Sequence, residues 1–240
     1  MDTHPVKRVQ VLNVPVDMAD QEQALKRIEK LLVDGGRHQI VFLDRQKLFK
    51  ARRNPEFRRC LREASLVLPI SEGIVRGARF TRKGELTRYE SFPFVIRLLS
   101  LAERLNRTVY LLGSRKQDLE KAERNLKDSF PALRLVGRFS GFISKTMKKD
   151  VLTAIKKASP AFLLAGNGLP ARDLWLLRHK KELQPGIYLW VGECFDYFSG
   201  RRNRRPRFDA RHLLKPWRIL RLFPLLYYWV LLIVYRIFKL

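Results

Sequence analysis

Short apolar runs alternate with amphipathic stretches along most of this chain. The apolar runs predict strands, because a strand that is buried on both faces reads as a continuous hydrophobic segment. We expect such strands at residues 9–14, 39–43, 66–69, 109–113, 133–136, 161–166 and 187–191.

The stretches between these runs carry apolar residues at helical spacing. In residues 20–32, Ala24, Ile28 and Leu31 fall on one face of a predicted helix. Asn54 followed by Pro55 is typical of a helix start, so a second helix is expected from there to about residue 64. The same periodicity predicts further helices at residues 91–105, 117–130, 145–157 and 170–179.

Repeated strand–helix alternation predicts an α/β fold with a Rossmann-like, mostly parallel sheet and helices on both faces. In such sheets ligands bind beyond the carboxyl ends of the strands, so the turns there are the places to search for a site. The composition changes near Gly200. We therefore expect an α/β domain over residues 1–200 and a basic, apolar helical appendage over residues 201–240.

The predicted appendage combines a basic cluster with an apolar, aromatic run at residues 222–235. That run is shorter than the roughly 20 residues that a bilayer-spanning helix needs. A helix lying in the membrane interface fits better, with basic side chains contacting anionic headgroups. The alternative is a helix packed on the core or at a dimer interface. The expected membrane or phosphate contacts are Arg201, Arg202, Arg204, Arg205, Arg207 and Trp217.

The charge balance narrows the classes of partner. Lys and Arg number 49 against 23 Asp and Glu, which gives a formal net charge of +26. Such a charge attracts polyanions: nucleic acid, anionic lipid or phosphate-bearing substrates. No nucleic-acid motif is present, so we expect no nucleic-acid partner. Cys60 and Cys194 have neither disulfide nor zinc spacing, and with no signal-peptide pattern they favour a cytoplasmic protein.

Several segments, in this order, resemble the WecB/TagA/CpsF glycosyltransferase family, the family 26 type. Together they cover about residues 9–207. The segments are VLNVPVDMADQEQALKRIEKLL, KARRNPEFRRCLREASLVLP, VYLLGSRKQDLEKA, FPALRLVGRFSGFI, FLLAGNGLPARDLWLLRH and VGECFDYFSGRRNRRPR.

The resemblance implies an inverting glycosyltransferase of cell-surface polysaccharide biosynthesis. Such an enzyme moves an N-acetylhexosamine-type sugar from a UDP-sugar to a polyprenyl-diphosphate-linked acceptor, without a metal or other cofactor. It also implies peripheral binding to anionic lipids on the cytoplasmic face of the inner membrane, and it allows a homo-oligomer.

The catalytic positions depart from the family pattern. Inverting transfer needs a base for the acceptor hydroxyl, and the family's LPDGIG-like Asp is Ile70 here. Glu72 lies two residues on and is the candidate base, although it could instead simply begin the next helix. Asp44 replaces the family's Asn and is a second candidate. Arg88 keeps the family's Arg and fits a diphosphate, with a plain surface arginine as the alternative.

Two glycine turns at predicted strand ends are candidate phosphate cradles, although such turns also occur as plain connections. Arg172 stands in the family's GAPKQE-like turn. Asp196 could bind a ribose or uracil edge, or instead cap a helix and orient Arg201 structurally. The expected nucleotide-binding residues are Gly113, Ser114, Gly166, Asn167, Gly168, Arg172 and Asp196.

Two functions therefore stay open within the resemblance. The first is an active transferase with a shifted base, Glu72 or Asp44. The second is a catalytically degenerate member that serves as a membrane-bound binding or scaffolding subunit. Changes at Phe42, Ile70 and Arg172, three positions of one expected pocket, favour the second more than a single change would.

Overall fold

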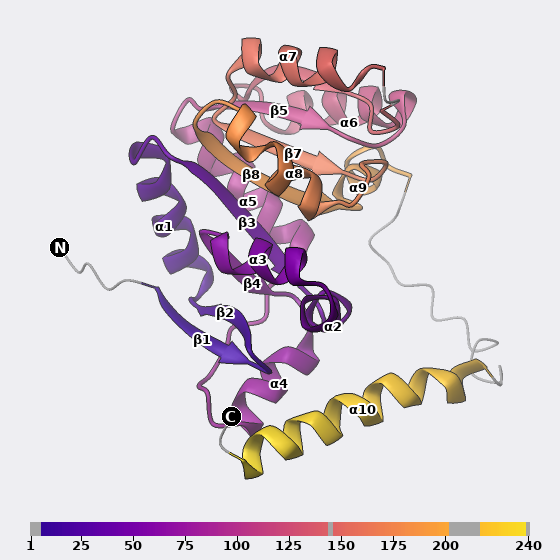
Figure 1. Ribbon diagram of the computed structural model, residues 1–240. Coiled ribbons are helices and arrows are strands. Elements are labelled where there is room, and N and C mark those ends of the chain that lie inside the picture. The colour runs from indigo at the N-terminus through magenta and orange to yellow at the C-terminus, as the bar shows by residue number, and fades with distance from the viewer. Residues whose placement is uncertain (1–5, 144–145, 202–216, 239–240) are drawn as a thin grey trace.

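The computed structural model describes residues 6–143, 146–201 and 217–238. Its centre is a parallel six-stranded sheet with the order β4-β3-β8-β7-β5-β6 (Figure 1). The strands are β3 (Arg37–Leu43), β4 (Leu66–Pro69), β5 (Thr108–Leu112), β6 (Arg134–Phe139), β7 (Phe162–Gly166) and β8 (Gly186–Gly192). The fold class predicted from the sequence is confirmed.

Helices cover both faces of the sheet because successive strand residues point to opposite sides. Ile40 and Phe42 join one buried cluster with α1 (Gln21–Val33), α5 (Ser91–Arg104), α6 (Lys116–Ser129) and α9 (Cys194–Phe198). Val41 and Leu43 face the other side. The elements on that side are α2 (Arg45–Arg53), α3 (Pro55–Glu63), α4 (Glu72–Phe80), α7 (Lys148–Ala158), α8 (Asp173–His179) and the short 3-10 turn Lys180–Glu182.

The amino-terminal apolar run is a hairpin and not one strand, so the single strand predicted at 9–14 is wrong. β1 (Lys7–Val11) pairs antiparallel with β2 (Val14–Met18). The two residues between them have positive φ, 51° at Leu12 and 62° at Asn13. A two-residue turn with that backbone matches the twist of the paired strands. Asn fits it well, but Leu gives no sequence signal for it.

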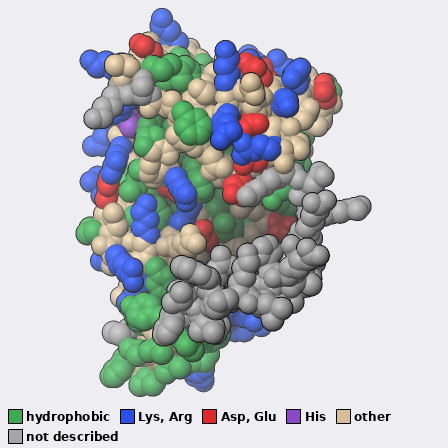
Figure 2. Space-filling view, turned by 90° about the vertical axis from the view of Figure 1, so that its right-hand side faces the viewer, with side chains coloured by type: hydrophobic (Ala, Val, Ile, Leu, Met, Phe, Trp, Pro, Cys, Tyr) green, Lys and Arg blue, Asp and Glu red, His purple; other side chains and the backbone are tan. Residues whose placement is uncertain are grey.

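The parallel strands all end at one edge of the sheet, which lies to the right in Figure 1 and faces the viewer in Figure 2. From β3 the chain moves outward to the edge strand β4, and from β5 it moves outward to the opposite edge strand β6. The connections thus diverge between these pairs, where β8 and β7 lie. Such a divergence leaves a crevice at the carboxyl ends.

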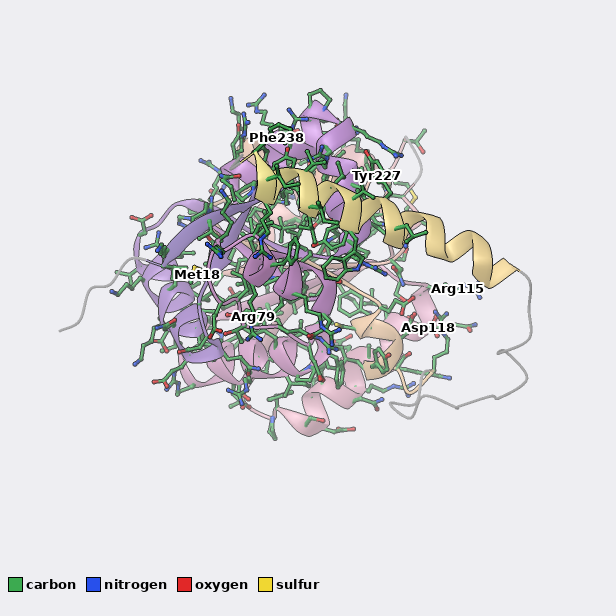
Figure 3. The ribbon with its side chains drawn as sticks, turned by 90° about the horizontal axis from the view of Figure 1, so that it is seen from below. Met18, Arg79, Arg115, Asp118, Tyr227 and Phe238 are labelled. Atoms are coloured by element: carbon green, nitrogen blue, oxygen red, sulfur yellow. The ribbon has the colours of Figure 1, made fainter. Side chains whose placement is uncertain are left out.

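The last described helix, α10 (Trp217–Ile237), crosses the underside of the molecule below α4 (Figures 1 and 3). Tyr228 and Leu232 are buried in the cluster that contains α4, and the Tyr228 hydroxyl donates to the Gly73 carbonyl at 2.8 Å. The Tyr235 hydroxyl lies 2.9 Å from Asn13 Nδ2 and 3.0 Å from Arg52 Nη1. One face of α10 therefore packs on the core.

The opposite face of α10 carries an outward stripe of exposed apolar residues, spaced at helical periodicity: Leu226, Val230, Ile233 and Ile237. Figure 2 shows hydrophobic side chains gathered at this lower end of the molecule. Among the described residues, no helix combines the length and the apolar character that crossing a bilayer requires.

Candidate active site

A cavity of about 490 Å³ lies where β3, β4 and β8 end, and we call it the main cavity because it contains Asp44 and Ile70, two of the expected catalytic positions. Figure 2 looks onto this edge of the sheet and shows acidic side chains around a hollow in it. The cavity lining combines apolar and ionisable residues: Phe42, Asp44, Lys47, Ile70, Glu90, Ser91, Phe92, Pro93, Trp190, Val191, Gly192, Glu193, Cys194 and Tyr197. Phe42 and Ile70 therefore line the space without filling it.

Lys47 brings a fixed positive charge to this cavity. Its Nζ donates to the Phe42 carbonyl at 2.8 Å and lies 2.7 Å from Asp173 Oδ2. It also lies 4.7 Å from the centre of the Trp190 ring, within range of a cation–π contact. The Asp173 side chain is 1% exposed. A buried pair of this kind ties α2 to the start of α8 and fixes where the ammonium lies.

Asp44 lines the cavity, and one of its carboxylate oxygens accepts a hydrogen bond within the fold. Asp44 Oδ1 accepts the Lys47 backbone N–H at 2.7 Å, so the residue caps the amino end of α2. Its other oxygen, Oδ2, makes no hydrogen bond to a described residue. The catalytic role expected for Asp44 stays a prediction.

Glu72 lies beside the main cavity and is not among its lining residues. It is the first residue of α4, as the alternative interpretation expected. Its carboxylate lies 3.1 Å from Arg76 Nε and 3.9 Å from Arg88 Nη1, and all three side chains are about half exposed or more. Glu72 and Arg88 are thus brought together, but their catalytic roles stay predictions.

A second cavity, of about 540 Å³, opens at the end of β7. Three of the expected nucleotide-binding residues, Asn167, Gly168 and Arg172, line it with Phe142, Ile143, Leu169 and Pro170. The Arg172 guanidinium lies 5.3 Å from the centre of the Trp190 ring, which lines the main cavity. Trp190 therefore lines the main cavity and also contacts Arg172 of the second cavity.

Gly113 and Ser114 serve mainly to pack two turns together. The Gly113 N–H donates to the Phe139 carbonyl, and the Ser114 N–H donates to the Asn167 carbonyl at 2.5 Å. A Cβ at Gly113 would lie 2.7 Å from the Gly166 nitrogen, so only glycine permits this approach. The N–H groups that were expected to face a phosphate here are already engaged within the fold.

Asp196 is buried and forms an ion pair with Arg201 at 2.7 Å, and Arg201 also lies 2.8 Å from Asp118 Oδ2. The Arg201 charge is thus balanced by two carboxylates, and the nucleotide-binding role expected for Asp196 stays a prediction. Arg202, Arg204, Arg205 and Arg207 lie outside the described residues, as does the side chain of Trp217.

Burial shifts the pKa values of three titratable side chains near the sheet towards their uncharged forms. Burial raises the pKa of the Cys60 and Cys194 thiols to about 12, so neither forms the nucleophilic thiolate near neutral pH. Burial lowers the pKa of His179, whose Nδ1 lies 2.7 Å from the Trp175 carbonyl inside α8. Within the described ranges, no three His, Cys, Asp or Glu side chains gather to hold a metal ion.

Sequence reasoning missed several lining residues of the main cavity, namely Lys47, Glu90, Trp190 and Glu193. Lys47 sits one turn into a helix that the pattern did not predict. Glu90 lies two residues after Arg88, where the sequence keeps the family's Arg. That signal alone could have found it.

The model of the Glycosyl transferase WecG/TagA/CpsF family matches residues 9–239 of this chain. Three similar relatives are each named N-acetylglucosaminyldiphosphoundecaprenol N-acetyl-beta-D-mannosaminyltransferase. The protein of Bacillus spizizenii is 22% identical over 92% of this chain and 84% of its own. Those of Bacillus subtilis and Staphylococcus aureus are each 20% identical, over 86% and 83% of this chain and 83% and 78% of their own.

Proposed function

This chain belongs to the Glycosyl transferase WecG/TagA/CpsF family, and from that premise we propose the reaction it performs. It transfers an N-acetylhexosamine-type sugar from a UDP-sugar to a polyprenyl-diphosphate-linked acceptor, with inversion at the transferred carbon. The relatives' printed names support the lipid-linked acceptor and the class of sugar. The UDP donor rests on the resemblance of the motifs to the family.

The observation that carries this proposal is the main cavity. It lies at the carboxyl ends of β3, β4 and β8, where open parallel sheets bind their ligands. It combines apolar walls with a few fixed polar groups, as ligand sites do. The second cavity, with Arg172 and the turn Asn167–Gly168, adjoins it across Trp190 and offers a place for part of a nucleotide.

The lipid-linked acceptor requires the protein to work at a membrane surface. We propose that α10 docks there through its outward stripe, Leu226, Val230, Ile233 and Ile237, which is exposed although apolar. A helix of this kind lies in the interface plane with its apolar side buried among the acyl chains. Residues 201–240 would then be a docking appendage to the domain over residues 1–200, peripheral on the cytoplasmic face.

A catalytically degenerate scaffold is the second candidate, and one observation favours it. Ile70 lines the main cavity where the family pattern has its Asp, and an isoleucine accepts no proton. Both functions include binding of a UDP-sugar, but only the transferase turns it over. A scaffold would bind a UDP-sugar without releasing UDP.

The test is calorimetry of the full chain with UDP-sugars, followed by a UDP-release assay with vesicles that contain a polyprenyl-diphosphate-linked sugar. The transferase predicts weak UDP-sugar binding and UDP release that depends on the acceptor. Binding without release would favour the scaffold. The absence of heat with every UDP-sugar would contradict both.

A further inference from the structure

The main cavity is lined by several carboxylates, although the chain as a whole is strongly basic. Asp44, Glu90 and Glu193 all line it, whereas the chain as a whole carries a net charge of +26. Acidic groups oppose a diphosphate, so their presence needs a reason other than binding one. Sugar transfer supplies one, because the attacking hydroxyl must lose its proton to a base.

These acidic groups are not equally free to accept a proton. Asp44 caps α2 through Oδ1, as described above. Glu193 is engaged in an interaction of its own. Glu72 faces Arg76 and Arg88 beside the cavity. Glu90 differs from them, because in the part of the chain that the structure describes its carboxylate makes no hydrogen bond or ion pair.

The backbone of Glu90 is held firmly against the end of β4. The Tyr89 N–H donates to the Pro69 carbonyl at 2.8 Å, and the buried Tyr89 hydroxyl lies 2.8 Å from the carbonyls of Ala19 and Asp20. Ile70 follows Pro69 directly, and its N–H donates to the Leu43 carbonyl. Glu90 and Ile70 therefore lie on one wall of the cavity, on segments joined by a hydrogen bond.

We propose that Glu90 is the general base of the transfer, in place of a carboxylate at position 70. Glu90 stands at the amino end of α5, yet its side chain makes no capping bond to that helix and instead lines the cavity. This assignment rests on the proposed function, and it replaces Glu72 and Asp44 as the expected proton acceptor.

The Glu90 carboxylate takes the proton of the acceptor hydroxyl, and that oxygen forms a bond to the anomeric carbon of the donor sugar. The bond from this carbon to the β-phosphate oxygen breaks, and UDP leaves with the electron pair. The protonated Glu90 then returns its proton to water, so no oxidant, reductant or further co-reactant is needed.

The test compares Glu90→Gln with a matched control, Glu85→Gln, in the full chain with lipid-linked acceptor. Glu85 lies in the preceding segment with its side chain 80% exposed and paired to Arg79. We expect Glu90→Gln to lower kcat by about 100-fold or more, since a general base contributes at least that much. UDP-sugar affinity by calorimetry should stay within about threefold, because Gln keeps the shape of the wall.

Rescue separates a proton acceptor from a residue that only shapes the wall. Ile70→Asp in the Glu90→Gln background returns a carboxylate to the same wall and should recover at least about tenfold of the lost rate. A Glu90→Gln rate equal to that of the parent would overturn the Glu90 assignment alone. A second outcome would also count against it. In that outcome Ile70→Asp does not restore the lost rate, and Glu90→Asp lowers kcat as much as Glu90→Gln does. A parent chain that never releases UDP would overturn the proposed function, and the base with it.

Discussion

At the residue scale, the buried pair of Lys47 and Asp173 stabilises the wall of the main cavity. Asp173→Asn removes the charge opposite Lys47 and leaves a buried ammonium unpaired. Removing one partner of a buried pair costs about 3–5 kcal/mol. We expect the free energy of unfolding in urea to fall by that order, because both side chains are at most 9% exposed.

The double variant Lys47→Met with Asp173→Asn is the control for this prediction. It removes the unpaired charge as well as the carboxylate, so it should be more stable than Asp173→Asn alone, and the two changes should be non-additive. Additive losses would show that the two side chains do not act as a pair. Asp173 Oδ1 has no hydrogen-bond partner among the described residues. The double variant therefore loses no hydrogen bond at this oxygen, which favours a partial recovery of stability.

Sequence reasoning could identify residues at the site only where a motif aligned them. It placed Asn167, Gly168 and Arg172 at one strand end, and the structure puts all three on one cavity. It noted the loss of an Asp at Ile70, which lines the main cavity. It could not find Lys47 or Trp190, because their positions depend on how α2 and β8 pack and not on local spacing.

At the scale of elements, the position of α10 rests on a close approach at Gly77. A Cβ at Gly77 would meet the Tyr228 hydroxyl and lie 3.2 Å from Leu232 Cδ2. Gly77→Ala in a helix would otherwise stabilise by up to about 1 kcal/mol. We expect it instead to destabilise by about 1–3 kcal/mol, the usual cost of overpacking, and to speed tryptic cleavage within α10.

The sign of this change is what tests the packing. Tyr228→Phe removes the hydroxyl that the new methyl group would meet, at the loss of the 2.8 Å bond to Gly73. In that background Gly77→Ala should cost less than in the parent. A stabilising Gly77→Ala in the parent chain would mean that α10 does not pack on α4 in solution.

Helices with a strong end signal or a clear apolar period were predicted well, the latter including α5, α6 and α7, which have no side-chain cap. The helix expected at 20–32 is α1, Gln21–Val33, with Asp20 capping it, and the one expected from Asn54 is α3, Pro55–Glu63. α2 was missed because Arg45–Arg53 is mostly basic and buries only Lys47, Leu48 and Ala51. The hairpin was missed because its turn places Leu12 at positive φ.

At the scale of the whole molecule, the sheet could be predicted because five largely buried strands and the half-exposed edge strand β6 leave few arrangements once each is followed by a helix. What the sequence left open was the role of the apolar carboxyl-terminal run. It offered interface binding and packing on the core as alternatives. The structure shows α10 packed on the core through Tyr228 and Leu232, with its other face exposed.

The exposed face of α10 predicts membrane binding that depends on the outward stripe. Val230→Asp with Ile233→Asp should weaken binding to vesicles containing anionic lipid by more than about tenfold, because each side chain loses roughly 1–2 kcal/mol of burial. The two side chains are 55% and 45% exposed, so the fold should tolerate the change. Vesicle sedimentation over a range of lipid concentrations measures the effect.

The control must add the same charge elsewhere. Val33 and Leu105 are exposed apolar residues, 80% and 38%, at the carboxyl ends of α1 and α5, and neither belongs to α10. Val33→Asp with Leu105→Asp changes the net charge equally, and electrostatic attraction alone would weaken both pairs alike. If the two pairs bind vesicles equally, or if a chain ending at Gly200 sediments as the full chain does, α10 is not the docking element. A loss confined to the α10 pair would place the lipid surface at the outward stripe, on the helix whose Tyr228 also donates to the Gly73 carbonyl in the first turn of α4.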